Sequence, residues 1–303
     1  MPVVSINHVT TYRYRKPVGF GEHRMMLRPL EAFDQRLIST ELEISPEPRM
    51  LRRVHDVSDS SIDVASFALK ADHLTFNSHT RVEHHASADF DLETASLSAG
   101  ARKDPYDRDE ALGLAASLSR RHPDSGEVEA WARAFLTASP QPVSSVLIRM
   151  TQAIRADFAY SLRLRGAPQT PQETLAARQG SCRDFAVLMM ESARSLGLAA
   201  RFVSGYVYSC SPSTAPTGGG HTHAWARVYV PGCGWVDFDP TNGIIGNFDL
   251  IRVAVVNDPR LALPLYGSWD GDADDYLGME VNVDIRVEPE LQQMPQLRVA
   301  ASR

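Results

Sequence analysis

Cysteine, excess cationic charge and long apolar runs are all scarce in this sequence of 303 residues. The three cysteines, Cys182, Cys210 and Cys233, are too few and too far apart for a disulfide framework or a Cys-x-x-Cys metal site. No window approaches the ~20 apolar residues that a membrane span needs, and the N-terminus lacks a signal-peptide pattern. We therefore expect a cytoplasmic protein with no metal ion, no cofactor and no membrane partner.

The net charge has the wrong sign for nucleic-acid binding. The chain carries 31 lysines and arginines against 37 acidic residues, a formal net charge of −6, whereas counterion release from nucleic acid needs a cationic face. Arginines between positions 24 and 53 make the first fifth locally basic, which we interpret as a solvated or salt-bridged surface. We expect no nucleic-acid partner.

The length exceeds the usual size of one domain, roughly 100 to 200 residues, and the sequence pattern changes after the first third. The early part alternates in polarity, with turn-forming residues at 44–48 and 56–61. A polar stretch follows near position 100. We expect an all-β, sandwich-like domain at 1–95, a linker at 96–110, a catalytic domain at 111–290 and a tail at 291–303.

The second part begins with helical periodicity and ends in strands, which predicts an α+β fold. Thr170-Pro-Gln-Glu173 is a capping box with proline at the first helical position, and the next helix begins near Cys182 and ends at Gly197. Apolar residues at three-to-four spacing predict earlier helices near 109–121, 126–136 and 143–157. Strand-like runs occupy 200–208, 223–230 and 235–239.

Cys182 is a candidate nucleophile because of its place in a helix. A thiol in the first helical turn lies near unpaired backbone N–H groups and the positive end of the helix dipole, which favour the thiolate. An isolated cysteine before an apolar helix is more often a small buried hydrophobe. A histidine partner is therefore needed to support the catalytic interpretation.

A predicted hairpin supplies both a histidine and a carboxylate. His223 opens one strand, and Asp239 ends the next. A three-residue loop at 231–233 pairs Val230 with Gly234 and places Asp239 opposite Trp225, on the same sheet face as His223. Asp237 falls opposite an arginine, Arg227, which gives it a charge partner of its own. The register therefore favours Asp239 as the partner of His223.

Three motifs occur in this order: Gly180-Ser-Cys-Arg-Asp-Phe-Ala186, His223-Ala-Trp225 and Gly234-Trp-Val-Asp-Phe-Asp-Pro-Thr-Asn242. In these motifs and their order the sequence resembles the transglutaminase-like cysteine enzymes of papain-like architecture, in particular a bacterial branch of cysteine proteases with an N-terminal β domain. Arg24-Met-Met-Leu-Arg-Pro29 resembles the β domain. The chain departs from that branch at Val256-Asn-Asp-Pro-Arg260, where an Arg-Asp-Tyr segment is usual.

The resemblance implies a helix that carries the nucleophile and packs on an antiparallel sheet. Its nucleophile, histidine and aspartate fall on Cys182, His223 and Asp239. Tyr160 and Trp225 are expected to contact substrate or the oxyanion, although Tyr160 has an equally good interpretation as a core aromatic.

These roles imply an enzyme that acts on amide bonds of a peptide or protein through a thioester acyl-enzyme. Hydrolysis, as in a peptidase or amidase, is the leading prediction. The alternative is a transglutaminase, in which an amine attacks the same thioester. The triad residues alone do not determine whether water or an amine is the acceptor. A further alternative is a non-catalytic peptide-binding protein that keeps the fold.

Overall fold

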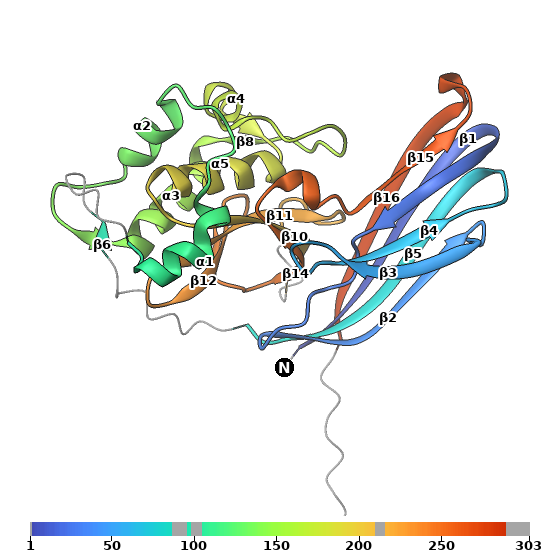
Figure 1. The fold of residues 1–303 in the computed structure, drawn as a ribbon, viewed down its shortest axis with the longest axis horizontal. Helices are drawn as coiled ribbons and strands as arrows, with labels where there is room; N and C mark the ends of the chain where they lie inside the picture. The colour runs from blue at the N-terminus through green and yellow to red at the C-terminus, as the bar shows by residue number, and fades with distance from the viewer. Residues whose placement is uncertain (1, 87–95, 98–104, 210–215, 289–303) are drawn as a thin grey trace, which may run out of the picture.

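The computed structural model describes residues 2–86, 96–97, 105–209 and 216–288. Two bodies lie side by side: a tall body made of strands, and a mixed body that contains the helices (Figure 1). None of the helices within the described ranges is long and apolar enough to cross a membrane.

The all-strand body is one antiparallel sheet organised around a single long strand, β1. The first half of β1 pairs with β5 and β16, and its second half pairs with β4 and β15. The register shifts between Arg13 and Val18, and such irregularities bend a strand and let it pass from one set of neighbours to another. The strands are β1 (Val3–Met25), β2 (Gln35–Ser45), β3 (Met50–His55), β4 (Ser61–Ser66), β5 (Ala71–His84), β15 (Leu265–Asp270) and β16 (Tyr276–Glu288).

The predicted turns at 44–48 and 56–61 lie between β2, β3 and β4, as expected. Three of the strands are long, with 23 residues in β1, 14 in β5 and 13 in β16. Apolar side chains from both halves of the sheet form one core cluster, which includes Phe20 and Ala65 from one half and Leu74 and Phe76 from the other. The body is therefore an antiparallel, sandwich-like β domain.

The structure corrects the expected domain boundaries. Strands β15 and β16 lie in the range 111–290 expected for the catalytic domain, but they pair with β1 and complete the N-terminal sheet. Alternation in polarity shows which residues share a face and not which sheet a strand joins, so the sequence could not assign them. In the expected linker, 96–97 pairs with 141–142 and α1 already begins at Arg108. The expected tail at 291–303 lies outside the described residues.

The mixed body contains the expected helices and one five-stranded antiparallel sheet. The helices are α1 (Arg108–Leu118), α2 (Glu127–Arg133), α3 (Val143–Asp157), α4 (Pro171–Ala177) and α5 (Cys182–Ser195). The sheet has the order β13 (Ile244–Ile245), β12 (Gly234–Asp239), β11 (His223–Val230), β10 (Ala200–Val207) and β14 (Leu250–Val256). The capping box at Thr170 and Glu173 is present, with proline at the first helical position.

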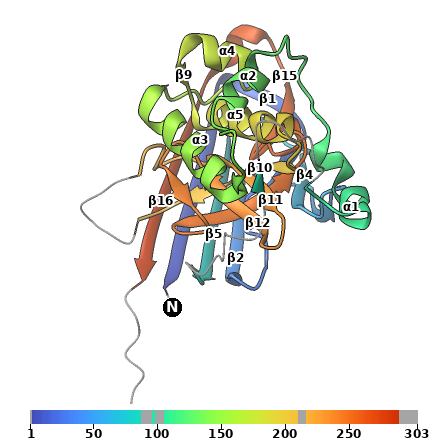
Figure 2. The same cartoon turned by 90° about the vertical axis from the view of Figure 1, so that its left-hand side faces the viewer.

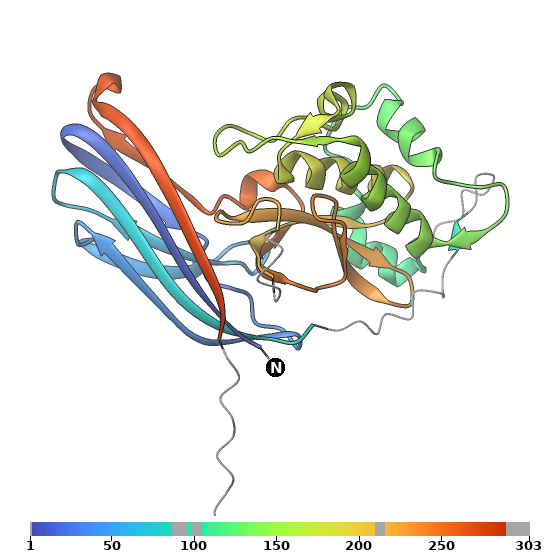
Figure 3. The same cartoon turned by 180° about the vertical axis from the view of Figure 1, so that it is seen from behind.

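Helix α5 is the centre of this body. It packs against β11 and β10 on one side and against α2, α3 and α4 on others (Figure 3). Residues 184–194 of α5 are buried without interruption, as expected for a helix that is enclosed on all sides. The first turn of α5 is thereby fixed against the first residue of β11, His223.

A buried polar interface joins the two bodies, and Figure 2 shows the β domain standing behind the mixed body. Arg252 of β14 donates hydrogen bonds to Asp34 of the β domain and to Asp237 of β12. Gln35 exchanges hydrogen bonds with the backbone of Arg252, at 2.8 and 3.0 Å. A buried hydrogen-bonded network of this kind fixes one relative placement of two bodies.

Candidate active site

Cys182 occupies the first helical position of α5, and the chain before it explains why the helix begins there. Asp184 accepts hydrogen bonds from the Ser181 backbone N–H at 2.7 Å and from its hydroxyl at 2.8 Å. A side chain on Gly180 would lie 2.8 Å from the Asp184 Cβ, so this approach requires glycine. The Cys182 thiol is therefore held at the positive end of α5, with only 7% of the residue exposed.

His223 and Asp239 meet in the register that the sequence predicted. Val230 pairs with Gly234, and the His223 Nε2 lies 2.9 Å from the Asp239 Oδ2. Both side chains are fully buried. Asp239 also accepts hydrogen bonds from the Thr241 backbone N–H at 2.9 Å and the Asn242 side chain at 2.8 Å. This network fixes the imidazole ring and directs its other nitrogen, Nδ1, away from Asp239.

The electrostatics of this cluster favour a protonated histidine. Burial alone would lower the pKa of His223, but the Asp239 carboxylate and the Cys182 sulfur raise it from 6.5 to about 10. Burial would raise the pKa of Asp239, whereas His223 and Asn242 hold it below its usual value. The arrangement thus suits an imidazolium held between the Asp239 carboxylate and the Cys182 sulfur, as in enzymes that pair a cysteine nucleophile with a histidine.

Tyr160, on a different element, brings its hydroxyl close to the His223 Nδ1. The two-residue strand β8 (Ala159–Tyr160) pairs in parallel with β9 (Gln179–Gly180), directly before Cys182. An added Cβ at Gly218 would lie 3.1 Å from the His223 Nδ1 and 3.2 Å from the Tyr160 hydroxyl, so both atoms point at one small space. Burial, then the charges of Cys182 and Asp239, raise the pKa of Tyr160 to about 12. Its phenol is therefore a neutral hydrogen-bond donor at neutral pH.

Trp225 does not reach the space shared by the His223 Nδ1 and the Tyr160 hydroxyl. It packs against the His223 ring instead. It is 0% exposed, and its indole N–H donates to Asp237 at 2.9 Å. Its ring stacks on the His223 ring, with 6.0 Å between centroids and 28° between planes. The expected substrate or oxyanion contact of Trp225 is therefore replaced by a packing role, because its N–H is already engaged.

Sequence reasoning missed three residues at this site. Asn242 was visible only as part of a motif, and Gly218 only as part of a glycine-rich loop. Arg252 carried a clearer signal, since a charged residue within the apolar run Leu250–Val256 indicates a buried ion pair. Cys210 lies outside the described residues, and Cys233 lies in the turn between β11 and β12.

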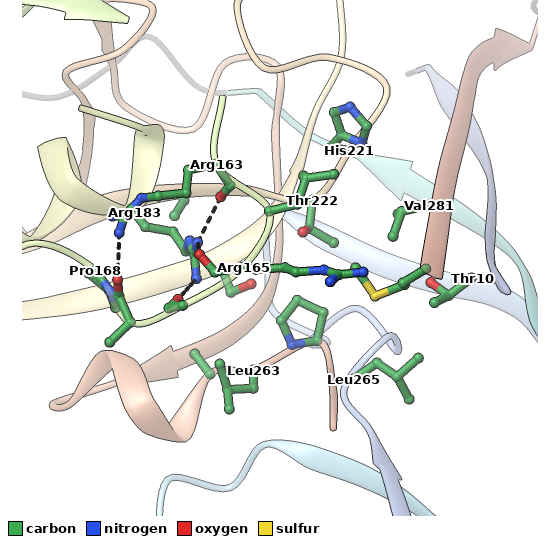
Figure 4. Close-up of a pocket in the computed structure, with 18 of the residues that line it drawn as sticks. Thr10, Arg163, Arg165, Pro168, Arg183, His221, Thr222, Leu263, Leu265 and Val281 are labelled. Carbon is green, nitrogen blue, oxygen red and sulfur yellow. Dashed lines mark hydrogen bonds between the residues drawn. The ribbon is translucent and has the colours of Figure 1, made fainter. Parts of the chain in front are cut away.

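A pocket of about 760 Å³ opens beside His223, between the two bodies (Figure 4). We call it the interdomain pocket. Its walls are the loop 162–168 and Arg183 from the mixed body, the segment 259–265, and side chains of β1 and β16. Figure 4 shows Arg183 bonded to backbone oxygens of the loop and Arg165 extending across the pocket toward Val281. Of Cys182, His223 and Asp239, only His223 contributes to the lining.

Comparison with protein families agrees with this architecture. Residues 129–240 match the transglutaminase-like superfamily, and residues 4–83 match the bacterial transglutaminase-like N-terminal region. The chain therefore carries the core of the transglutaminase-like superfamily, preceded by a bacterial transglutaminase-like N-terminal region.

Individual relatives extend this result over most of the chain. An uncharacterized protein of Mycobacterium tuberculosis is 28% identical over 92% of this chain and 91% of its own length. A further uncharacterized protein, from Mycobacterium leprae, is 27% identical over 87% of this chain and 92% of its own length. A crystal structure from Cytophaga hutchinsonii, provisionally named as a cysteine protease, has a TM-score of 0.68 at 20% identity, covering 94% of this chain and 90% of that chain. The last comparison concerns the fold.

Proposed function

We propose that this protein is a cysteine-nucleophile enzyme that hydrolyses amide bonds of a peptide or protein. Cys182 is the nucleophile, His223 the acid–base group and Asp239 the carboxylate that orients it. The observation that supports the proposal is the buried hydrogen bond between His223 and Asp239, beside a cysteine at the first turn of α5. The transglutaminase-like core and the likeness to a provisionally named cysteine protease agree with it.

The acylation step uses the charges already in place. The Cys182 thiolate attacks the amide carbon, and the carbonyl π electrons move onto oxygen to form an oxyanion. The Cys182 backbone N–H at the start of α5 and the neutral Tyr160 hydroxyl are the donors available to it. The His223 imidazolium then passes its proton to the amine nitrogen, the C–N bond breaks, and a thioester remains on Cys182.

The deacylation step returns the enzyme to its starting state. The neutral His223 takes a proton from water as the water oxygen attacks the thioester carbon. Collapse of the oxyanion releases a carboxylic acid and restores the Cys182 thiolate beside the His223 imidazolium. Asp239 keeps the Nε2–H of His223 fixed throughout, so that Nδ1 faces the reacting atoms.

Mass spectrometry of peptide mixtures incubated with and without a primary amine tests the reaction type. Hydrolysis predicts new peptide termini or deamidated side chains whose yield does not depend on the amine. Products that incorporate the amine in preference to water would identify a transglutaminase instead. The Cys182→Ala variant is the control, and we expect it to form no product while its unfolding midpoint stays near that of the wild type. A thiol that iodoacetamide alkylates no faster than a free cysteine would favour a non-catalytic peptide-binding protein.

A further inference from the structure

The interdomain pocket has an unusual charge for a protein that is acidic as a whole. Its lining includes four arginines and no aspartate or glutamate, although the formal net charge of the chain is −6. Clefts lined by charge of one sign attract ligands of the opposite sign. The pocket is therefore suited to a ligand that carries negative charge.

Two of these arginines are already paired with carboxylates that lie outside the lining. Arg163 contacts Asp184, and Arg260 contacts Asp258. Arg165 and Arg183 form no such ion pair with any described residue. Arg183 donates to the backbone oxygens of Arg163 and Gly166, at 2.7 and 2.9 Å, so its guanidinium is fixed and serves to shape the loop.

Arg165 is the cation best placed to receive a ligand. Its side chain is exposed, donates one hydrogen bond to the Tyr276 hydroxyl of β16, and lies over the Tyr276 ring with 5.0 Å to the centroid. These contacts direct the guanidinium across the pocket without neutralising it, and a guanidinium retains further N–H donors for a carboxylate.

The rest of the pocket is apolar and partly uncovered. Leu162, Leu164 and Leu263 line it with 51%, 44% and 37% of their surfaces exposed. Large apolar side chains gathered around a pocket mark a binding surface more often than an ordinary solvated one. The volume of about 760 Å³ also lies within the range of small-molecule and peptide sites, ~300 to 1,000 Å³.

We propose that the interdomain pocket is the substrate subsite, and that it takes a peptide segment with bulky apolar residues next to an acidic one. The apolar side chains lie against Leu162, Leu164 and Leu263, and the aspartate or glutamate side chain pairs with Arg165. This inference rests on the proposed function, because His223 is one of the residues that line the pocket and so brings the bound segment beside the reacting amide bond. The β domain, through β1 and β16, thereby contributes one wall of the substrate site.

Binding to the Cys182→Ala variant tests this subsite separately from the chemistry. The probes are two fluorescent hexapeptide mixtures with blocked termini, both containing leucine and phenylalanine, one with glutamate and the other with glutamine at the remaining fixed position. Fluorescence anisotropy gives a dissociation constant for each. We expect the glutamate mixture to bind about tenfold more tightly, as a charge-assisted pair contributes about twice what a neutral one does.

Arg165→Gln, made in the same Cys182→Ala background, should remove this preference, and Arg165→Lys should restore part of it. Arg133→Gln is the matched control, since Arg133 is an exposed arginine of α2 outside the pocket. Equal binding of the two mixtures, or an equal loss with Arg133→Gln, would overturn the proposal. A third mixture, with glutamine and a free C-terminal carboxylate, separates the side chain from the chain end: binding as tight as that of the glutamate mixture would also overturn the proposal. Because the Cys182 thiol is absent from these variants, the outcomes do not depend on whether the enzyme hydrolyses the thioester or transfers it to an amine.

Discussion

Arg252, in the sheet of the mixed body, donates a hydrogen bond to Asp34 of the β domain, and both side chains are almost fully buried. The same guanidinium bonds Asp237, at 3.2 Å, and Asp237 in turn bonds Trp225, which stacks on His223. A continuous chain of contacts thus runs from the β domain to the candidate acid–base group. The β domain is therefore part of what holds His223 in place.

Loss of Arg252 should destabilise the fold strongly. Arg252→Leu leaves Asp34 and Asp237 buried without their cation, and removal of one partner of a buried ion pair costs about 3–5 kcal/mol. Urea unfolding followed by tryptophan fluorescence measures this loss. Arg36→Leu is the control, because Arg36 pairs with Glu83 at the surface, where such pairs contribute about 1 kcal/mol or less. An equal, small loss for both variants would show that the Arg252 network is not an essential contact.

Substitutions at Asp239 and Asp237 should have different effects: the first should lower the catalytic rate and the second the stability. Asp239→Asn should lower the hydrolysis rate by several orders of magnitude, as the matching change in serine-type triads costs about 10⁴, because an amide no longer holds the Nε2–H tautomer. Asp237→Asn should leave the rate per folded molecule within a few-fold of wild type but lower the unfolding midpoint. Rates and midpoints of both variants provide the comparison. A larger rate loss for Asp237→Asn would mean that Asp237, and not Asp239, orients the histidine.

Tyr160→Phe tests the source of the oxyanion donor. Loss of one such donor lowers kcat by about 10²–10³, and KM should change little because the hydroxyl acts on charge that develops in the transition state. Tyr229→Phe, whose hydroxyl bonds Glu110 away from this cluster, is the control. Full activity in Tyr160→Phe would assign Tyr160 to packing against Phe185, whose ring lies 6.5 Å away between centroids.

Acid should destabilise the interface between the β domain and the mixed body. Burial, with a smaller contribution from His221, lowers the pKa of His8 to about 4. Burial lowers the pKa of His84 to about 4 as well; Asp34 and Asp237 oppose this shift, and Arg252 and His85 add to it. Both are below the ordinary 6.5, so the unfolded chain binds protons that the folded chain does not. The free energy of unfolding therefore falls as pH drops from about 6.5 to about 4, by up to ~1.4 kcal/mol per pH unit for each histidine.

Urea unfolding at several pH values checks this expectation. His8→Gln and His84→Gln should each be less stable than wild type at pH 7, since they disturb the bonds to Tyr206 and Tyr208. Their stability should also decline less steeply toward acid. The exposed His73→Gln should keep the wild-type slope. If the interface variants keep that slope as well, these histidines do not titrate on unfolding as argued.

Local sequence patterns predicted much of the mixed body. The five helices, the capping box at Thr170 and the pairing of Val230 with Gly234 follow from spacing and turn chemistry within short stretches. The approach of Asp239 to His223 followed from that register alone. These features depend on contacts that are local in sequence, the His223–Asp239 pair being 16 positions apart.

Contacts between distant segments could not be predicted in this way. Residues 276–288 were not among the predicted strands, and no local pattern indicates that β16 pairs with β1. Arg252 was visibly out of place in an apolar run, yet nothing local identified Asp34 as its partner. The alternation of β11 correctly placed Trp225 on the same sheet face as His223. It did not show that Asp237 and Arg252 form a buried ion pair over Trp225, where a substrate contact was expected.

The pairing of β1 with β16 also determines the order in which the protein can be completed during synthesis. Val3 pairs with Glu288 and Tyr14 with Tyr276, so one hydrogen-bonding edge of β1 stays open until residues 276–288 have left the ribosome. Contacts of such long sequence separation form slowly, and an open strand edge is a site for pairing with other chains. The nascent β domain therefore stays incomplete until the mixed body, which lies between its two parts in the sequence, has been synthesised, and the open edge of β1 is where we expect aggregation to begin.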